Sequence, residues 1–540
     1  MSSNRPMWQR FLAAVLGAVT WGVMATSVHS QSPPRRLPAV PLSYAGADQV
    51  ATLNFEPPPL ESPAIDRETV QKIVREELQA EKAQTSAAAE SKPAPEALEI
   101  GKDRTLISKW DNGFVAETAD KAFRIHLGGR LEFDNSWFNQ SDNILIGPSD
   151  DQTMRDGTLF RRARFRSDGR LWENIDFACE VNFANIQDVS NVDNSAVQLG
   201  SVGLTDFYLT FREVPWVSNI RIGHVQAPIS LERYSSSNAW YYMERSSMYD
   251  AFYNPNDYQN GVVVFDSYWD DRVTLAGSAA WISKADVQSF GFGADEGKYG
   301  VGARVTGLPI YEDEGRTLLH FGTGYFHQAL VEDRFNIASR ELLRAGAGGT
   351  QTPNLVFTGT FFTPNGAHIA NVEGAFVNGP FSVSGEYAVT HVIDVFDQAT
   401  PTFTGSRGDV TYQAAYVETG LFVTPGDQRR YDKKTGTWVR TIPVENACVM
   451  KQDKCRDGYG AVQLCARYTF LDLVSGEPVL TPTSGGARAG LQHDVTLGVN
   501  WYLNSQTWFM INYVATRLDS VVPGASGDIH GIGCRLHFDF

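Results

Sequence analysis

The residues of this chain best suited to chemistry are arginines at even positions in one short segment. Residues 160–165 read FRRARF, and the even-numbered arginines of this region are Arg162, Arg164, Arg166 and Arg170. Side chains two residues apart lie on the same face of a strand, so these guanidinium groups would form a ladder on one side of a sheet. Guanidinium matches the oxygens of phosphate and carboxylate. The chemistry indicated is the attraction and reversible binding of anions.

Other charged residues extend this ladder or neutralise it. Arg124 and Arg130 have the polar parity of the preceding segment. A row of like charges in a confined space is tolerable only if anions or carboxylates lie among them. The alternative is therefore that the arginines pair across neighbouring strands with Asp176, Glu180 and Asp206 and only stiffen a wall. The residues alone leave both interpretations open.

The elements that would carry the ladder are strands with one apolar face. Apolar and polar residues alternate in the segments 123–133, 175–183, 207–211, 495–503 and 509–515. Alternation with period two is typical of strands that have one apolar face and one polar face. The same parity predicts that the odd residues of the arginine segment form its apolar face, namely Leu159, Ala163, Phe165 and Leu171.

The number of strands favours a barrel over a sandwich. No segment after residue 30 approaches 18 consecutive apolar residues, which excludes membrane-spanning helices. The stretch 101–540, at roughly 25 to 28 residues for each strand with its connection, gives about 16 strands. We therefore expect an all-β protein, a 16-stranded antiparallel transmembrane β-barrel, whose apolar faces meet lipid and whose polar faces line a water-filled channel.

Both ends of the chain fit an exported barrel. The last seven residues, CRLHFDF, alternate in polarity and end on Phe540. They resemble the closing strand of bacterial outer-membrane barrels, whose aromatic ending is a signal for the barrel assembly machinery. At the other end, Arg5 and Arg10 precede the apolar run 11–25, which is too short to span a membrane. We expect a Sec signal peptide over 1–30 and a location in the outer membrane.

Composition divides the rest of the chain. Residues 31–100 are rich in Pro, Ala, Ser and Glu and predict a periplasmic linker, with a short amphipathic helix, or a frayed solvated one, at about 65–84. The barrel domain would then occupy 101–540. Cys448 and Cys455 are spaced for one local disulfide.

The sequence offers no signs of catalysis. It contains no HEXXH, GxSxG or Walker motif, and its ten histidines are scattered, so we expect no enzyme, no cofactor and no metal site. The formal charge of −16 argues against a nucleic-acid partner.

Eight segments, in order along residues 110–540, resemble the phosphate-selective porin O and P family. They are HLGGRLEFD from His126, FRRARF from Phe160, TDFYLTF from Thr205, RIGHVQAPISLE from Arg221, SSSNAWYYMERS from Ser235, FSVSGEYAVT from Phe381, YVETGLFVTPGDQRRYDKKTG from Tyr416 and LGVNWYLN from Leu497. The resemblance implies a homotrimer of outer-membrane barrels in contact with lipid, each with a loop that folds inward and narrows the passage for small inorganic anions.

The constricting loop departs from the family pattern at one position. The resemblance places in this loop, or just before it, Arg233, Ser236, Ser237, Asn238, Glu244 and Arg245. The family has lysine at the position of Asn238, and its loss would weaken attraction for doubly charged phosphate. Asp206 matches a family aspartate near the central arginines, where a carboxylate would stop an anion from binding too tightly to leave.

The implied function is a porin for diffusion of small anions, with phosphate and polyphosphate as candidate solutes. One alternative is a structural barrel that tethers the outer membrane to the cell wall or surface layer through 31–100. A soluble secreted β-protein is a third possibility, and detergent extraction would separate it from a barrel.

Overall fold

The computed structural model describes most of the chain after residue 103. The described residues are Lys72, Glu76, 104–144, 153–184, 203–253, 258–282, 298–330, 333–346, 352–398, 402–447, 458–474, 489–521 and 524–540. The chain divides into two compact units, 1–98 and 99–540. The expected signal peptide, both cysteines of the expected disulfide and all of the expected linker except Lys72 and Glu76 lie outside the described residues; these two are helical and exposed.

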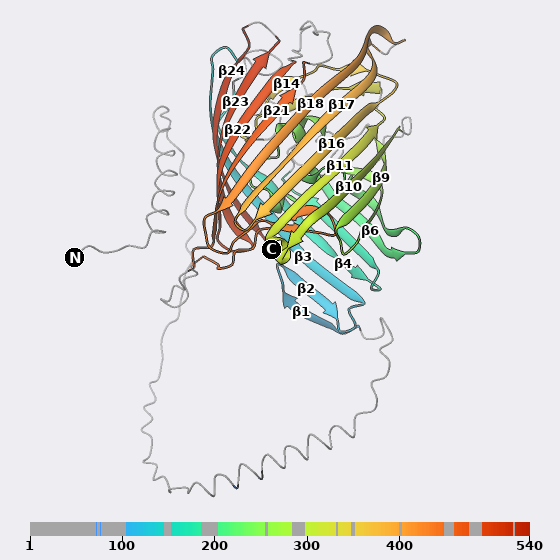
Figure 1. Ribbon diagram of the computed structural model, residues 1–540, viewed down its shortest axis with the longest axis vertical. Coiled ribbons are helices and arrows are strands. Elements are labelled where there is room, and N and C mark those ends of the chain that lie inside the picture. The colour runs from blue at the N-terminus through green and yellow to red at the C-terminus, as the bar shows by residue number, and fades with distance from the viewer. Residues whose placement is uncertain are drawn as a thin grey trace, which may run out of the picture. The chain divides into compact units, whose positions relative to one another are not determined.

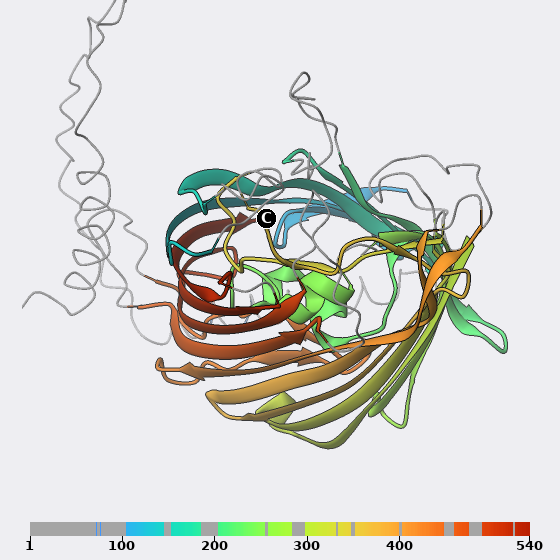
Figure 2. The same cartoon turned by 90° about the horizontal axis from the view of Figure 1, so that it is seen from above.

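The second unit is a closed antiparallel barrel, as the sequence predicts. Within its described part, sixteen strands follow one another around the ring, and β24 pairs with β3 to close it (Figures 1 and 2). The barrel strands are β3 (Phe123–Gln140), β4 (Gly157–Leu171), β5 (Ile175–Asn182), β6 (Gly203–Val214), β7 (Ser218–Gln226), β8 (Tyr258–Tyr268), β9 (Val273–Ile282), β10 (Lys298–Glu312), β11 (Thr317–Gln328), β16 (Ala367–Asn378), β17 (Phe381–Gln398), β18 (Thr404–Phe422), β21 (Ala461–Asp472), β22 (Gly490–Tyr502), β23 (Thr507–Ser520) and β24 (Gly527–Asp539).

Shorter elements extend the ring or lie in its connections. They are β1 (Leu106–Trp110), β2 (Phe114–Thr118), β12 (Arg334–Phe335), β13 (Ala338–Arg340), β14 (Asn354–Phe357), β15 (Phe361–Phe362), β19 (Arg430–Asp432), β20 (Thr437–Val439), the helices α3 (Leu231–Tyr234) and α4 (Ser247–Phe252), and the 3-10 turns η1 (Ser237–Ala239) and η3 (Asp313–Gly315). The β1–β2 hairpin continues the sheet beside the first residues of β3. Among the described residues, no helix has the length and apolar composition needed to cross a membrane.

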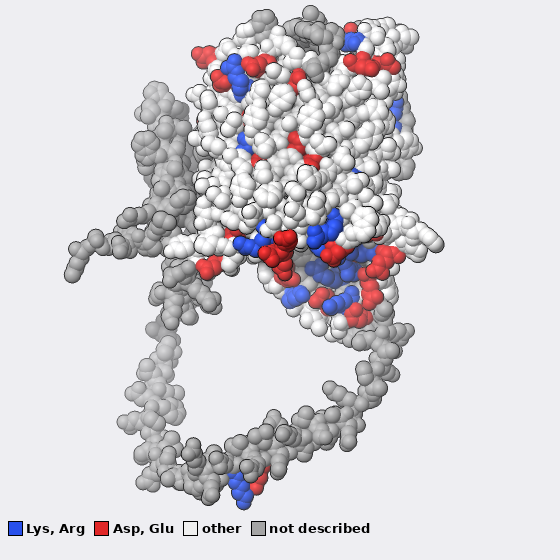
Figure 3. Space-filling view, viewed as in Figure 1, with Lys and Arg blue, Asp and Glu red and all other residues white. Residues whose placement is uncertain are grey.

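The two faces of the strands differ as the alternation predicts. On β24, Leu536 and Phe538 are exposed on the outside, whereas Arg535 and His537 are buried inside the barrel. Figure 3 shows the result for the outer surface, where a band almost free of charged side chains separates two charged rims. Such a band is typical of a surface in contact with lipid.

A bulge in β4 corrects one detail of the predicted parity. Phe133 faces Phe160 and the preceding Glu132 faces Arg162, so Arg161 is an additional residue in β4. Phe160 is 54% exposed, and its ring packs 5.2 Å from that of Phe133 on the outer face. The prediction that Leu159 lies on the apolar outer face is therefore wrong, because a bulge shifts the alternation by one residue.

The two ends of the barrel are distinguished by their connections. Most connections at one end are short turns, such as 172–174, 215–217 and 379–380, with 423–460 as the exception, and most at the other end are long, as in 183–202 and 283–297. In outer-membrane barrels the short turns are periplasmic and the long loops extracellular. This rule assigns the β1–β2 hairpin and the C-terminus to the periplasmic end.

Candidate functional site

The barrel lumen holds an inward-folded segment, 227–253, which we call the constriction loop. It follows β7 and contains α3, η1 and α4, which appear in green inside the ring in Figure 2. A serine caps each of the two helices: the Ser230 hydroxyl accepts from the Arg233 amide at 3.2 Å and the Ser246 hydroxyl from the Tyr249 amide at 3.3 Å. These caps satisfy amides that very short helices would otherwise leave unpaired.

One side of the lumen fixes the constriction loop through its backbone. We call this side the docking wall; it is formed by the inward faces of β16, β17 and β21 to β23. The Leu231 amide donates to Glu373 at 2.7 Å, and the Glu232 amide donates to Glu386 at 2.6 Å. Further along, the Met243 amide donates to the Asn512 side-chain oxygen at 2.8 Å. Since these amides belong to the loop backbone, the docking wall sets its position.

Glycines allow the loop to lie close to the barrel. At Gly324 on β11, a Cβ atom would come within 1.9 Å of the Ile229 carbonyl oxygen. At Gly420 on β18, a Cβ atom would lie 2.4 Å from the Tyr241 ring. Any larger residue at either position would displace the loop.

The opposite side, the inward faces of β3 to β6, carries the predicted ladder and is called the arginine wall. Arg164 pairs with Glu180 at 2.7 Å, and Arg170 pairs with Asp176 at 2.8 Å. Arg166 pairs with Asp206, also at 2.8 Å. The pairing that the sequence left open therefore occurs, and it involves the carboxylates named in that alternative.

The arginines in the upper part of the arginine wall, nearer the end with long loops, also have partners. Arg162 is buried, donates to Glu132, and lies 5.0 Å from the centre of the Trp240 ring. Arg130 donates to the hydroxyl of Ser237 in the constriction loop. These two arginines therefore hold the loop and the wall together.

The predicted arginines of the constriction loop lie within its own packing. Arg245 is held between the rings of Trp240 and Tyr249, at 4.1 and 4.0 Å from their centres, and donates to the carbonyl oxygen of Arg233 at 2.9 Å. Arg233 itself is 1% exposed. Burial on this scale makes both arginines supports of the loop fold.

Asn238 joins the loop to the last strand. Its amide donates to the Asp539 carboxylate at 2.8 Å, and Arg440 donates to the same carboxylate at 2.6 Å. Arg440 belongs to the long connection 423–460 between β18 and β21. This segment also reaches the loop, because the Trp438 amide donates to the Ser235 hydroxyl at 3.1 Å.

The Glu244 carboxylate interacts with several arginines, although sequence reasoning gave it no role in the anion pathway. It accepts from Arg161 at 2.9 Å and from Arg535 at 3.3 Å, and Arg344 lies 4.0 Å away. Burial alone would raise the pKa of Glu244, but the charge and hydrogen bond of Arg161, together with the charges of Arg344 and Arg535, outweigh burial and hold the pKa well below its usual range. The segment FRRARF contains Arg161, the main partner of Glu244. Strict alternation would place the Arg161 side chain on the outer face, and the bulge in β4 turns it into the lumen.

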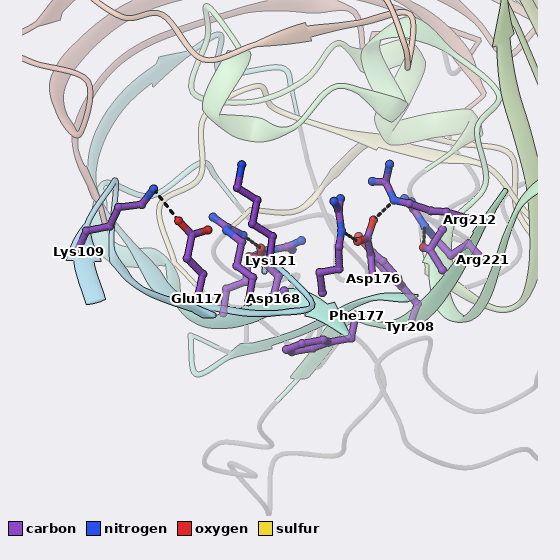
Figure 4. A pocket seen from close by; sticks show the side chains of 14 residues that line it. Lys109, Glu117, Lys121, Asp168, Asp176, Phe177, Tyr208, Arg212 and Arg221 are labelled. Atoms are coloured by element: carbon purple, nitrogen blue, oxygen red, sulfur yellow. Dashed lines mark hydrogen bonds and ion pairs between the residues drawn. The ribbon is translucent and has the colours of Figure 1, made fainter. Parts of the chain in front are cut away.

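A polar cavity of about 590 Å³ opens beneath the loop at the short-turn end. It is lined by Lys109, Glu117, Lys121, Arg124, Arg166, Asp168, Gly169, Arg170, Asp176, Phe177, Tyr208, Thr210, Arg212 and Arg221. Seven of these side chains are cationic and three are anionic, a formal charge of +4. In Figure 4 the labelled charged side chains stand on the lumen side of the strands, whereas Phe177 points away.

The cavity contains only part of the predicted pathway. Arg124, Arg166 and Arg170 line it, whereas Arg130, Arg162, Arg164, Asp206 and the constriction-loop residues do not. Sequence reasoning missed Lys109 on β1 and Lys121 in the turn between β2 and β3, both of which precede the first clear alternation. It also missed Arg212 and Arg221, although Arg212 continues the polar parity of β6.

Comparison with known proteins gives one family. The model of the family described as phosphate-selective porin O and P matches residues 127–540. Porin O of Pseudomonas aeruginosa is 26% identical over 454 residues, which cover 81% of this chain and 92% of that protein. An uncharacterized protein of Caulobacter vibrioides is 24% identical over 475 residues, covering 83% of this chain and 82% of the relative.

Solved structures of other barrels align at low identity. The outer membrane channel DcaP of Acinetobacter baumannii has a TM-score of 0.42 at 13% identity, over 78% of this chain and 99% of that one. The anion-selective porin from Comamonas acidovorans has a TM-score of 0.42 at 12% identity, over 77% and 99%. TM-scores in this range carry no inference about selectivity.

Proposed function

The chain belongs to the phosphate-selective porin O and P family and is an anion channel of the outer membrane, and from this premise we propose where its anions pass. The passage runs along the arginine wall, beside the constriction loop, and through the cavity at the periplasmic end. Arg124, Arg166 and Arg170 form its lower part, together with the lysines and arginines that share the cavity. Arg130, Arg162 and Arg164 form its upper part.

The observation that carries this proposal is the charge of the cavity. Some of the lining side chains pair with one another, but the lining as a whole has seven cationic side chains against three anionic ones around about 590 Å³. A confined space with low-dielectric walls concentrates counter-ions more strongly than an open surface does. At physiological ionic strength, open-surface charges are screened within about 8 Å. The cavity should therefore raise the local concentration of anions at the periplasmic mouth.

The paired carboxylates give the pathway its second property. Asp168, Asp176 and Asp206 each accept from an arginine of the wall. An anion that approaches must share these guanidinium groups with a fixed carboxylate, so it is bound weakly and leaves quickly. Conduction requires this balance between entry and release. We propose phosphate and polyphosphate as the first solutes to test.

The assembly of the channel is also a proposal. By resemblance to the family, three copies form a homotrimer after insertion by the barrel assembly machinery. Residues 1–30 would be removed as a signal peptide, 31–100 would be a periplasmic linker, and 101–540 would form the channel. Native mass spectrometry of the mature protein should give three copies, with a first residue near position 31. A monomer would contradict the trimer.

The direct test of the anion pathway is a reversal potential in planar bilayers under a salt gradient. The wild-type channel should prefer anions at neutral pH. The variant Arg124→Gln, Arg166→Gln, Arg170→Gln should move the reversal potential toward cations. Arg517, which pairs with Asp519 and Asp528 on the outer face, supplies the control, because Arg517→Gln changes no lumen charge. A cation-selective wild-type channel would contradict the proposal.

A further inference from the structure

Histidines gather on the outer face of the barrel, away from the lumen. On strands of the described part of the chain, five lie on the same face as the exposed apolar side chains and toward the end with long loops: His327, His368, His391, His493 and His530. Aromatic side chains usually hold barrels at the level of lipid headgroups through tyrosine and tryptophan. Here, imidazoles lie at that level beside tyrosines such as Tyr325, Tyr468 and Tyr513.

Three of these histidines form a continuous row. His327 on β11 lies directly opposite His368 on β16, and His368 lies directly opposite His391 on β17. The rings of His327 and His368 are in contact, with centroids 4.6 Å apart. We call these three residues the histidine row. His493 and His530 have no such neighbour, because β23 separates their strands and places Arg517 and Ala515 opposite them.

The row lies at the upper limit of the apolar outer band. Below it on β17, the outward face carries Phe381, Val383 and Val389, all apolar. Beside it on β18, the outward face changes to Thr411 and Asp409. Figure 3 shows the uncharged band ending in a charged rim at this end of the barrel. Because long loops mark the extracellular end, the row faces the headgroups of the outer leaflet.

Few other titratable groups surround the row. The Tyr325 hydroxyl and His368 Nδ1 form a hydrogen bond at 2.7 Å, which survives protonation because a hydroxyl can accept as well as donate. His391 Nε2 lies 3.9 Å from the Asp409 carboxylate. The carboxylate of Asp394, three residues after His391 on β17, accepts a hydrogen bond from Asn365. On the β10 side, the residue opposite His327 is Val301.

Protonation would turn this row into a cationic patch. Imidazole is the side chain that ordinarily gains a positive charge in mild acid, so a row of three imidazoles can become cationic below neutrality. Adjacent positive charges repel one another unless an anion lies among them. Asp409 can balance one ring, which leaves about two positive charges facing lipid. Among the described residues, no group of three or more His, Cys, Asp or Glu is arranged to hold a metal ion.

We propose that the histidine row is a binding site for phosphate groups of anionic lipids in the outer leaflet, and that it binds them in mild acid. Neutral imidazoles release the lipid above the titration range. A phosphate bridging the rings removes their mutual repulsion, so lipid and protons bind together. The site is separate from the ion pathway, which lies on the other face of the wall.

The test measures lipids that remain bound to the purified full-length channel in native mass spectrometry. Phosphatidic acid is the probe and phosphatidylcholine the zwitterionic reference, at about pH 5.5 and about pH 8, on either side of the imidazole pKa. The wild type should retain several-fold more phosphatidic acid at the lower pH. The variant His327→Gln, His368→Gln, His391→Gln should lose this difference, with unchanged heat-modifiable gel mobility.

Matched variants test whether the pH difference belongs to the three residues of the histidine row. His493→Gln with His530→Gln removes two outward histidines outside the row and should keep the pH difference. His391→Arg places a permanent charge in the row and should retain phosphatidic acid at both pH values. Equal retention by the wild type at both pH values, or equal loss in the control pair, would overturn the proposal. So would complete displacement of the lipid by equimolar inorganic phosphate.

Discussion

The arginine wall and the docking wall are built from the same kind of strand but use their inward charges differently. On the docking wall, carboxylates and amides such as Glu386 and Asn512 accept from the backbone of the constriction loop. On the arginine wall, guanidinium groups pair with side chains of neighbouring strands, as Arg164 does with Glu180. The docking wall uses its polar groups to hold the backbone of the loop. The arginine wall contacts loop side chains through Arg130, Arg161 and Arg162 and keeps its other arginines beside open space.

This difference explains the position of the cavity. A loop fixed through its amides on one side leaves the other side of the lumen for water and ions. The lining of the cavity accordingly comes from β1 to β7 and contains no residue of the docking wall. The asymmetry predicts that substitutions in the docking wall change the loop and those in the arginine wall change selectivity.

The largest effect is expected from breaking the docking wall at Glu373. This buried carboxylate pairs with Arg304 at 2.6 Å and accepts the Leu231 amide. Removing one member of a buried ion pair destabilises a protein by about 3 to 5 kcal/mol. Glu373→Ala should therefore lower the temperature of the heat-modifiable gel shift and make single-channel current noisy. Glu373→Gln keeps an acceptor and should be milder; equal behaviour of the two variants would contradict the docking role.

The next effect sharpens the comparison within the arginine wall itself. Arg124, Arg166 and Arg170 line the cavity, whereas Arg162 and Arg164 are paired above it. Neutralising the cavity set with glutamine should reduce the anion-to-cation permeability ratio severalfold without changing gel mobility. Arg162→Gln should also disturb packing and change the gel mobility, because it leaves the buried Glu132 with one arginine fewer. Reversal potentials and gel shifts together distinguish the two outcomes.

A smaller effect is expected where the two walls meet, at Asn238. Asn238→Lys would place an ammonium group beside Asp539, which already accepts from Arg440. The added positive charge should strengthen the block of chloride current by phosphate. Asn238→Met, with a side chain of similar length and no charge, is the control. An unchanged block in the lysine variant would remove this position from the ion pathway.

The smallest effect concerns the segment 333–346, which also reaches the docking wall. Burial, followed by the charge of Asp494, raises the pKa of Glu341 to about 8. The folded protein therefore binds this proton more tightly than the unfolded chain, so the contribution to stability falls as pH rises from about 4.5 to about 8. Current noise should increase between neutral and alkaline pH in the wild type. In Glu341→Gln it should be independent of pH, and persistence of the change there would exclude Glu341.

The strands and their faces were predictable because period-two alternation is local. The pattern of 123–133 and the ending CRLHFDF identified β3 and β24 and the side on which each residue lies. The number of strands followed from length. One extra residue defeated this reasoning at Leu159 and Arg161, since a bulge leaves no mark in the alternation of charged residues.

The site was less predictable because it depends on contacts between distant segments. Arg245 matched the family motif, yet only the fold shows its packing between Trp240 and Tyr249. In the same way, Arg440 lies 99 residues from its partner Asp539, and Lys109 reaches the cavity from a hairpin that precedes the barrel. Local sequence patterns contain no information about such contacts between distant residues.

Closure of the ring has a consequence for how the chain folds. Arg535 on β24 bonds Asp134 on β3, two residues that are 401 positions apart. Until the last strand is in place, both edges of a growing sheet expose unpaired backbone groups, which readily pair with other chains. Contacts this distant in sequence form slowly. The most aggregation-prone period in the life of the protein therefore lasts until its final strand has joined the first one of the ring.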